Sequence, residues 1–252
     1  MGIKAISLNR CTLLQSRLVN SELNYMLKII YLALVHALLI VFLFKSSTIK
    51  QMFNDRDVVS PYYLQMTAFH HRVDANLGPG LNIFIGDSLV QGLAVNSIVN
   101  NSVNFGIGGD TTSGVLKRLP LYQSIAMSKR VIFAVGHNDL YHESADVSIA
   151  NFKKIFDSIP PNVEVLICSI FFIDENITQK VNNLAISELN NKIQDLTDNY
   201  SHINYIDTNQ WAAPLGTLDE NLHIGDGVHL NKRGNELWIS QLKIALNKND
   251  KK

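Results

Sequence analysis

Short apolar runs alternate with stretches of helical character over most of the chain after residue 80. The apolar runs occupy residues 81–85, 102–105, 130–135, 163–168 and 203–206. The helical stretches lie between and after them, at 88–99, 111–119, 147–158, 178–198 and 232–247. Continuous apolar strands that alternate with amphipathic helices are typical of a parallel sheet covered on both faces. The pattern therefore predicts an α/β domain with about five parallel strands.

A different hydrophobic pattern lies near the N-terminus, where residues 26–44 carry one charged side chain, Lys28. The segment is long enough to cross a bilayer and has no polar face, so it predicts a transmembrane anchor in preference to a core helix. A cleaved signal peptide is the main alternative, although the residues after Phe44 lack a small-residue cleavage pattern. A slight excess of basic side chains before the segment places the rest of the chain outside the cytoplasm.

These patterns divide the chain into five segments. They are an N-terminal flank (1–25), the anchor or signal segment (26–44), a polar linker (45–80), the α/β domain (81–248) and a C-terminal tail (249–252). A breaker cluster, Asn-Leu-Gly-Pro-Gly at 76–80, marks the start of the regular domain. The linker is either a spacer or a segment that folds over the cleft.

Composition excludes several classes of protein. With 252 residues, of which 46% are hydrophobic and 17% charged, the chain can bury a large core. Equal numbers of basic and acidic side chains, 22 of each, argue against a nucleic-acid partner. The two cysteines, Cys11 and Cys168, form no CxxC pair, so no zinc ribbon, thioredoxin site or disulfide framework is expected.

Polar residues suited to chemistry follow the predicted strands. Four segments carry them: Gly86-Asp87-Ser88, Gly106-Ile-Gly-Gly-Asp-Thr-Thr112, Gly136-His-Asn-Asp139 and, before the last helix, Asp226-Gly-Val-His229. Ligands bind beyond the carboxyl ends of parallel strands, so these segments are expected to share one site. Each is weak evidence alone, because the first is an ordinary turn sequence and the second lacks the third glycine of a dinucleotide-binding loop.

Together these segments supply the groups that acyl transfer requires, namely a nucleophile, a base, a group that orients the base and donors for an oxyanion. Ser88 offers a hydroxyl where a strand turns into a helix, and the helix start adds its free N–H groups. His229 can take the serine proton while Asp226 holds its other ring nitrogen. The Ser88 N–H, the Gly109 N–H and the Asn138 side-chain amide would form the oxyanion hole. Glycine at 109 suits a close approach of substrate to the backbone.

These four segments resemble the four blocks of the SGNH hydrolases, also called GDSL esterases and lipases. The family name records the serine, glycine, asparagine and histidine that match Ser88, Gly109, Asn138 and His229. The α/β-hydrolase class is excluded, because its elbow has glycine two residues after the serine and Val90 stands there.

The resemblance covers residues 82–245 and is strong in the second block. Residues 104–112 are similar to the corresponding block of platelet-activating-factor acetylhydrolase catalytic subunits. The resemblance implies a flavodoxin-like, three-layer α/β/α domain that uses no metal and no cofactor.

Three residues are candidates for the substrate pocket. His137 stands where the family usually has a small or hydroxyl residue, so it is expected to border the acyl or alcohol pocket. His142 and Trp211 are further candidates, against the alternative of surface and packing roles. Asp87 and Asp110 are expected to brace their loops by accepting backbone N–H groups.

The leading hypothesis is a serine ester hydrolase that removes short acyl groups, acetyl in particular, from a carbohydrate or lipid ester. The preference for short chains comes from the second block and is family analogy. One alternative is a lysophospholipase or thioesterase that acts on longer chains, and another is an acyltransferase to a glycan acceptor. A non-catalytic binding module is disfavoured because no group of the site is missing.

Overall fold

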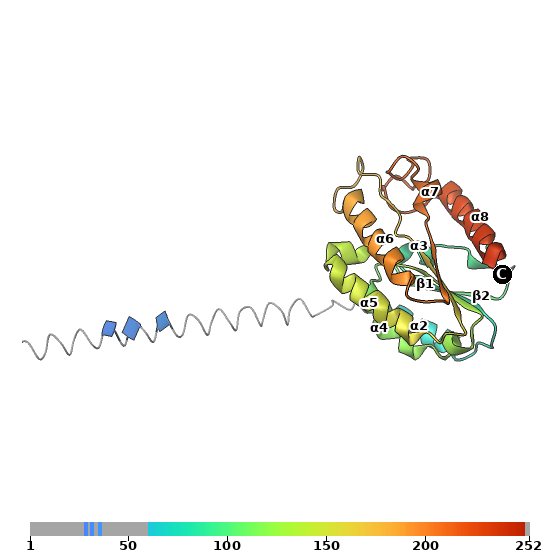
Figure 1. The fold of residues 1–252 in the computed structure, drawn as a ribbon, viewed down its shortest axis with the longest axis horizontal. Helices are drawn as coiled ribbons and strands as arrows, with labels where there is room; N and C mark the ends of the chain where they lie inside the picture. Colours follow the sequence, from blue (N-terminus) through green and yellow to red (C-terminus); the bar gives the residue numbers. More distant parts are fainter. Residues whose placement is uncertain (1–27, 30, 33–34, 37–59, 250–252) are drawn as a thin grey trace, which may run out of the picture. The chain divides into compact units, whose positions relative to one another are not determined.

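The computed structural model describes residues 28–29, 31–32, 35–36 and 60–249 (Figure 1). The few described residues before residue 60 are helical. Most of the predicted anchor, 26–44, lies outside the described residues, and among those described no helix is long and apolar enough to span a bilayer. The compact unit that carries the α/β fold is Ser60–Lys252.

Five parallel strands form one sheet, as the apolar runs predict. The strands are β1 (Asn82–Gly86), β2 (Ser102–Gly106), β3 (Arg130–Ala134), β4 (Glu164–Cys168) and β5 (Ile203–Ile206). Their order is β2-β1-β3-β4-β5, and every neighbouring pair is parallel. This is the flavodoxin-like order, in which the crossover direction reverses beside β1 and leaves room for a ligand at the carboxyl ends of β1 and β3.

Helices connect the strands and follow the last of them. The α-helices of the compact unit are α2 (Pro61–Asp74), α3 (Ser88–Gln91), α4 (Thr112–Arg118), α5 (Ala145–Ser158), α6 (Asn183–Thr197), α7 (Asn209–Ala212) and α8 (Lys232–Asn249). Four short 3-10 helices complete them: η1 (Val95–Ser97), η2 (Leu119–Leu121), η3 (Gln123–Met127) and η4 (Asn138–Tyr141).

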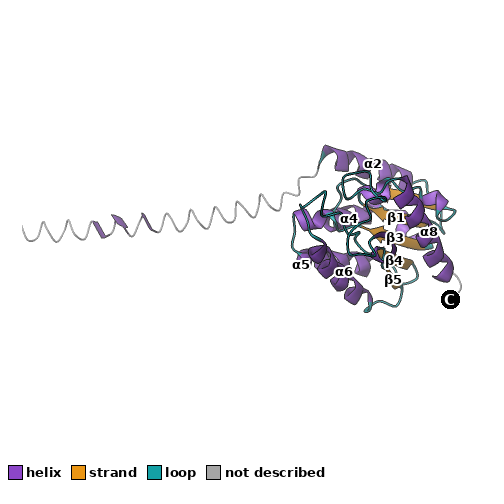
Figure 2. Cartoon of the chain, turned by 90° about the horizontal axis from the view of Figure 1, so that it is seen from above, coloured by secondary structure: helices purple, strands orange, loops and turns teal. Residues whose placement is uncertain are grey.

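The sheet separates two hydrophobic cores, and β1 shows how. Ile83 and Ile85 pack on one face with buried side chains of α4, α5 and α6. Phe84, which lies between them, points to the other face and packs with residues of α3, α7 and α8. The alternation of a strand thus produces three layers, with α8 on one side of the sheet and α4 to α6 on the other (Figures 1 and 2).

Two predicted helices differ from those observed. The stretch predicted at 178–198 becomes helical only after Asn182. The Asn182 side chain caps α6 by accepting the Ala185 N–H at 2.8 Å. Val181 is buried in the preceding loop and so imitates the helical spacing. The stretch predicted at 88–99 stops at Gly92, which ends α3.

The segment before residue 81 is not all linker, because α2 belongs to the compact unit. Ser60 caps this helix at its start. At its end the buried Asp74 accepts the N–H groups of Gln123 and Ser124, at 2.7 and 3.2 Å. The predicted domain boundary at residue 81 is therefore too late, and the fold begins at Ser60.

Candidate active site

The candidate nucleophile, Ser88, stands at the carboxyl edge of the sheet as the first residue of α3. β1 ends at Gly86, where an added Cβ would lie 2.1 Å from the Ala134 carbonyl oxygen, so no larger residue fits. Asp87 follows as the N-cap and accepts the Leu89 N–H at 3.0 Å, which confirms the expected bracing role. The strand end, the glycine and the cap together turn the chain sharply at Ser88.

Ser88, His229 and Asp226 lie in one line of hydrogen bonds although 141 residues separate the first two. The Ser88 Oγ is 2.9 Å from His229 Nε2, and His229 Nδ1 is 2.6 Å from Asp226 Oδ2. The other carboxyl oxygen of Asp226 accepts the N–H groups of Val228 and His229, at 3.0 and 2.9 Å. Partial burial acts to raise the pKa of Asp226, but these hydrogen bonds outweigh it and the pKa is lowered. The carboxylate is thus ionised and can hold the imidazole.

The second and third loops meet at the proposed oxyanion donors. Gly109 has φ +77°, a left-handed conformation that favours glycine, and an added Cβ would meet nothing within 4 Å. The left-handed backbone conformation is therefore as good a reason for glycine at position 109 as the close approach of substrate. The Asn138 side-chain amide donates to the Asp110 carbonyl oxygen at 2.9 Å and so fastens the two loops together.

A buried ion pair supports these loops from below. Arg118 Nε lies 2.8 Å from Asp110 Oδ2, and the same guanidinium donates to the Gly86 carbonyl oxygen at 3.3 Å and to the Tyr122 hydroxyl at 3.1 Å. Burial raises the pKa of Asp110 to about 6 against the opposing effect of Arg118. Asp110 also accepts the Thr111 N–H at 3.0 Å, as expected for a bracing residue. Arg118 was not among the predicted site residues, because a basic side chain in a helical stretch is usually exposed and nothing in the sequence marks this one as buried.

A second buried carboxylate, Asp139, anchors the Asn138 loop. Asp139 accepts the Thr112 N–H at 3.0 Å and also its hydroxyl, and Asn151 donates to that hydroxyl at 3.1 Å. Its pKa is raised by burial, which these hydrogen bonds oppose. Its position directly after Asn138 was the available signal for this role, which was not predicted.

A cleft of about 230 Å³ opens over Ser88. Besides Ser88, four residues predicted for the site line it: Asn138, Asp226, His229 and His137. Six further residues complete the lining: Asp87, Leu89, Tyr141, Thr178, Lys180 and Val228. Polar side chains such as Lys180 and Thr178 thus stand beside the candidate nucleophile.

Three residues predicted for the site are not among those that line this cleft. Gly109 lies in the loop that Asn138 holds through its hydrogen bond to the Asp110 carbonyl oxygen. His142 follows the end of η4 and is in ring contact with Tyr141 instead, at 6.2 Å between centroids. Trp211 packs edge-on against Phe171 at 5.5 Å, as part of the core on the α8 side of the sheet.

His137 is the buried wall of the cleft. Its Nε2 is 2.8 Å from the Tyr141 hydroxyl. Burial, with a smaller effect of His229, lowers the pKa of His137 to about 4. The ring is therefore neutral at ordinary pH, and it contributes shape and a hydrogen bond to the cleft but no charge.

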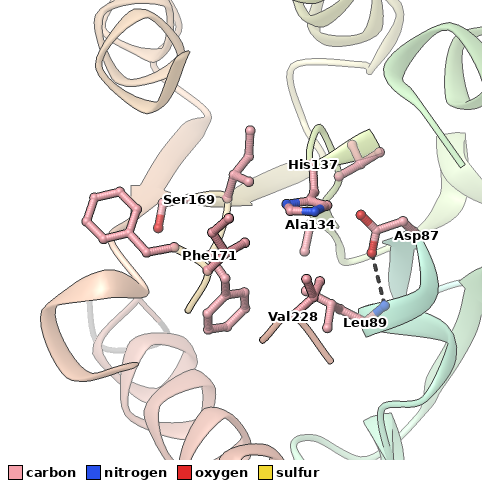
Figure 3. A pocket seen from close by; sticks show the side chains of 11 residues that line it. Asp87, Leu89, Ala134, His137, Ser169, Phe171 and Val228 are labelled. Carbon is pink, nitrogen blue, oxygen red and sulfur yellow. Dashed lines mark hydrogen bonds between the residues drawn. The ribbon is translucent and has the colours of Figure 1, made fainter. Parts of the chain in front are cut away.

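A narrow recess adjoins the cleft and shares Asp87, Leu89, His137 and Val228 with it (Figure 3). Its remaining walls come mainly from Ala134 and the apolar residues 170–173 after β4. The recess measures about 10 Å³, which is room for roughly one water-sized group.

Comparison with known proteins agrees with the geometry. The GDSL-like Lipase/Acylhydrolase family matches residues 84–237, which is more than half of the chain. The chain belongs to this family. It is an enzyme of the GDSL, or SGNH, serine esterase type, as the resemblance of the four segments predicts. None of the curated proteins compared with the chain matches it.

Solved structures of low sequence identity share the fold. A structure from Streptococcus pneumonia that is named for platelet activating factor has a TM-score of 0.69 at 19% identity, covering 79% of this chain and 99% of its own. A lipase/acylhydrolase from Enterococcus faecalis has a TM-score of 0.60 at 20% identity, covering 67% and 96%. Axe2, an acetylxylan esterase from Geobacillus stearothermophilus, has a TM-score of 0.52 at 18% identity, covering 65% and 93%.

Proposed function

We propose that this acylhydrolase works through a triad of Ser88, His229 and Asp226 and removes short acyl groups from a polar alcohol. The observation that carries the proposal is the unbroken line of hydrogen bonds from the Ser88 hydroxyl to the Asp226 carboxylate. In such a line the aspartate fixes the tautomer of the histidine, so that Nε2 is free to accept the serine proton.

The reaction follows from these contacts. Ser88 Oγ attacks the ester carbonyl carbon while its proton passes to His229 Nε2. The Ser88 N–H, the Gly109 N–H and the Asn138 amide stabilise the oxyanion. His229 then protonates the departing alcohol, and a water molecule activated by the same ring releases the acyl group as an acid.

The narrow recess supports a short acyl group. Its volume of about 10 Å³ suits the methyl group of an acetyl ester, and it offers no room for a long chain. The wider cleft, which Ser88 lines, has polar side chains in its walls that include Tyr141, Thr178 and Lys180. A carbohydrate alcohol suits these walls better than a hydrocarbon does.

Family analogy supports the same substrate class. One structural neighbour is an acetylxylan esterase and another is named for platelet activating factor. The polar cleft favours the carbohydrate ester over the lipid ester, and over a lysophospholipase or thioesterase activity on longer chains.

The test is hydrolysis of p-nitrophenyl acetate and p-nitrophenyl palmitate by the wild-type protein and by Ser88→Ala. We expect cleavage of the acetate ester that falls by at least about 10⁴-fold in the variant, because the nucleophile is lost. A Ser88→Ala protein with wild-type activity would refute the triad. A clear preference for palmitate would refute the short-acyl proposal and leave the triad intact.

We also propose that residues 26–44 anchor the enzyme in a membrane with the catalytic domain outside the cytoplasm. The length of the segment, with Lys28 as its one charged side chain, supports a span, and the basic residues before it support this orientation. Membrane fractionation with protease added to intact cells tests it. Digestion of the domain from outside is expected, whereas recovery of the full-length chain in the cytosol would overturn the proposal.

A further inference from the structure

His223 lies buried beside the turn that carries Asp226 and His229. An isolated antiparallel bridge pairs His223 with Leu230, so the chain folds back on itself around the turn. The Ile224 N–H donates to the His229 carbonyl oxygen at 2.9 Å and closes the same loop. The burial of this ring beside the turn calls for a specific role.

The ring of His223 has two backbone donors on one nitrogen. The N–H groups of Gly225 and Gly227 both donate to its Nδ1, at 3.0 and 3.2 Å. A nitrogen that accepts two hydrogen bonds carries no proton, so the neutral ring has its proton on Nε2. His229 requires the opposite tautomer, because its Nδ1 faces the Asp226 carboxylate.

The two glycines that His223 holds are the immediate neighbours of Asp226. Gly225 has φ +99° and Gly227 has φ +76°, conformations that other residues rarely adopt. A Gly-Asp-Gly segment has a large conformational freedom to lose on folding. Two hydrogen bonds to one buried ring fix both flanking peptides and thereby the direction of the Asp226 side chain.

The far side of the ring faces the loop after β4. His223 Nε2 is 3.4 Å from the buried Asp174 Oδ2, which is a close electrostatic contact though longer than a good hydrogen bond. The Asp174 N–H donates to the Gly227 carbonyl oxygen at 2.9 Å. His223 therefore lies between a loop anchored to the sheet and the turn that carries the triad acid.

We propose that His223 is a positioning residue for the reaction. Its Nδ1 fixes the conformation of the Gly225-Asp226-Gly227 turn. The turn fixes the direction of the Asp226 carboxylate, and the carboxylate orients His229 toward Ser88. The inference rests on the proposed triad and assigns no chemical step to His223 itself.

Three substitutions separate the functions of the two ring nitrogens. In His223→Asn, the amide Oδ1 is the same number of bonds from the backbone as Nδ1 and can accept both glycine N–H groups. In His223→Gln, the amide reaches the place of Nε2 but leaves no acceptor in the place of Nδ1. His223→Ala removes both contacts. The matched control is His71→Ala, because His71 is an exposed histidine on α2.

The readouts are kcat and KM for p-nitrophenyl acetate and the low-field proton resonance of the His229 Nδ1–H. We expect His223→Gln and His223→Ala to lose about 10- to 100-fold in kcat at nearly unchanged KM, since a small misplacement of a catalytic group has this effect. His223→Asn should stay within about threefold of wild type and keep the resonance. Equal losses in the Asn and Gln variants, or wild-type kcat in all three, would overturn the proposal.

A measurement on the wild-type protein covers the case in which a variant fails to fold. ¹⁵N spectra should show His223 with an unprotonated Nδ1 and a protonated Nε2. The reverse tautomer would overturn the proposal without any substitution. A fluorophosphonate adduct on Ser88 in the Gln variant would show that the nucleophile is intact, so failure of the positioning proposal and failure of the triad are distinguishable.

Discussion

The two halves of the active site are built in different ways. Around Ser88, the loops leave the sheet directly and rest on buried charges, with Arg118 and Asp110 at 0% and 1% side-chain exposure. The Asp226 and His229 side chains are 40% and 44% exposed and sit on a glycine-flanked turn. Buried ionic groups strongly destabilise a protein when one partner is removed, whereas exposed pairs contribute little to stability. Substitutions of the buried charges around Ser88 should therefore lower stability, whereas substitutions in the turn of Asp226 and His229 should lower activity.

Asp226→Asn should show the largest effect, and on activity alone. The amide oxygen can still accept the N–H groups of Val228 and His229, so the turn is retained. The other atom can no longer hold the required tautomer of His229, and we expect kcat to fall by roughly 10⁴-fold. Steady-state kinetics beside thermal melting check this. A loss of activity matched by a large fall in melting temperature would erase the contrast between the halves.

Arg118→Met should show the converse behaviour. It leaves the Asp110 carboxylate buried without its cation, and we expect the free energy of unfolding to fall by about 3–5 kcal/mol. Urea denaturation measures the change. The double variant Arg118→Met/Asp110→Asn should recover part of the loss, because the unpaired charge is gone. No recovery in the double variant would show that packing of the Arg118 side chain, and not charge pairing, dominates.

Asn138→Ala tests both properties at once, because Asn138 belongs to the half around Ser88 that rests on buried charges and is also proposed to bind the oxyanion. We expect a loss of about 100- to 1000-fold in kcat, the usual effect of removing one oxyanion donor. Its hydrogen bond to the Asp110 carbonyl oxygen is also lost, so a modest loss of stability should accompany it. Full retention of kcat would remove Asn138 from the proposed oxyanion hole.

Asp87→Asn should make the stability of the protein depend less on pH. Burial raises the pKa of Asp87 from 3.8 to about 7, so the folded protein binds this proton more tightly than the unfolded chain. Its contribution to stability is complete below pH 3.8 and is lost as the pH rises through about 7. The variant keeps an acceptor for the Leu89 N–H but cannot titrate. Urea midpoints across this range should vary less with pH in the variant than in wild type.

The sequence predicted best the features that depend on local patterns. Apolar runs located all five strands to within one residue at each end. The prediction was easiest for β1, β3 and β4, which are buried along almost their whole length, whereas β2 and β5 are only partly buried. The order of chemical groups along the chain predicted that Ser88, Asn138, Asp226 and His229 come together, since parallel strands bring their carboxyl ends to one edge, and all four line one cleft.

Features that depend on distant partners were missed. Helix α2 carries no clear apolar stripe, because two of its inward residues are the polar His70 and Asp74. Asp74 finds its donors in residues 123–124, far along the chain. The same holds in part for His223: one ring nitrogen accepts from the nearby Gly225 and Gly227, but the other faces Asp174, far along the chain. A polar residue gives no sign in a single sequence of the buried partner that it will find.

The position of α8 has a consequence for how the enzyme is made on the ribosome. The last strand ends at Ile206, yet the proposed base, His229, and the helix that covers the second face of the sheet both follow it. A nascent chain that has completed its sheet therefore still exposes Phe84, Ile132 and their neighbours and has no base. The proposed base and the cover of this face are gained together only once His229 and α8 have been made, so a chain that terminates before them would be inert and prone to aggregation.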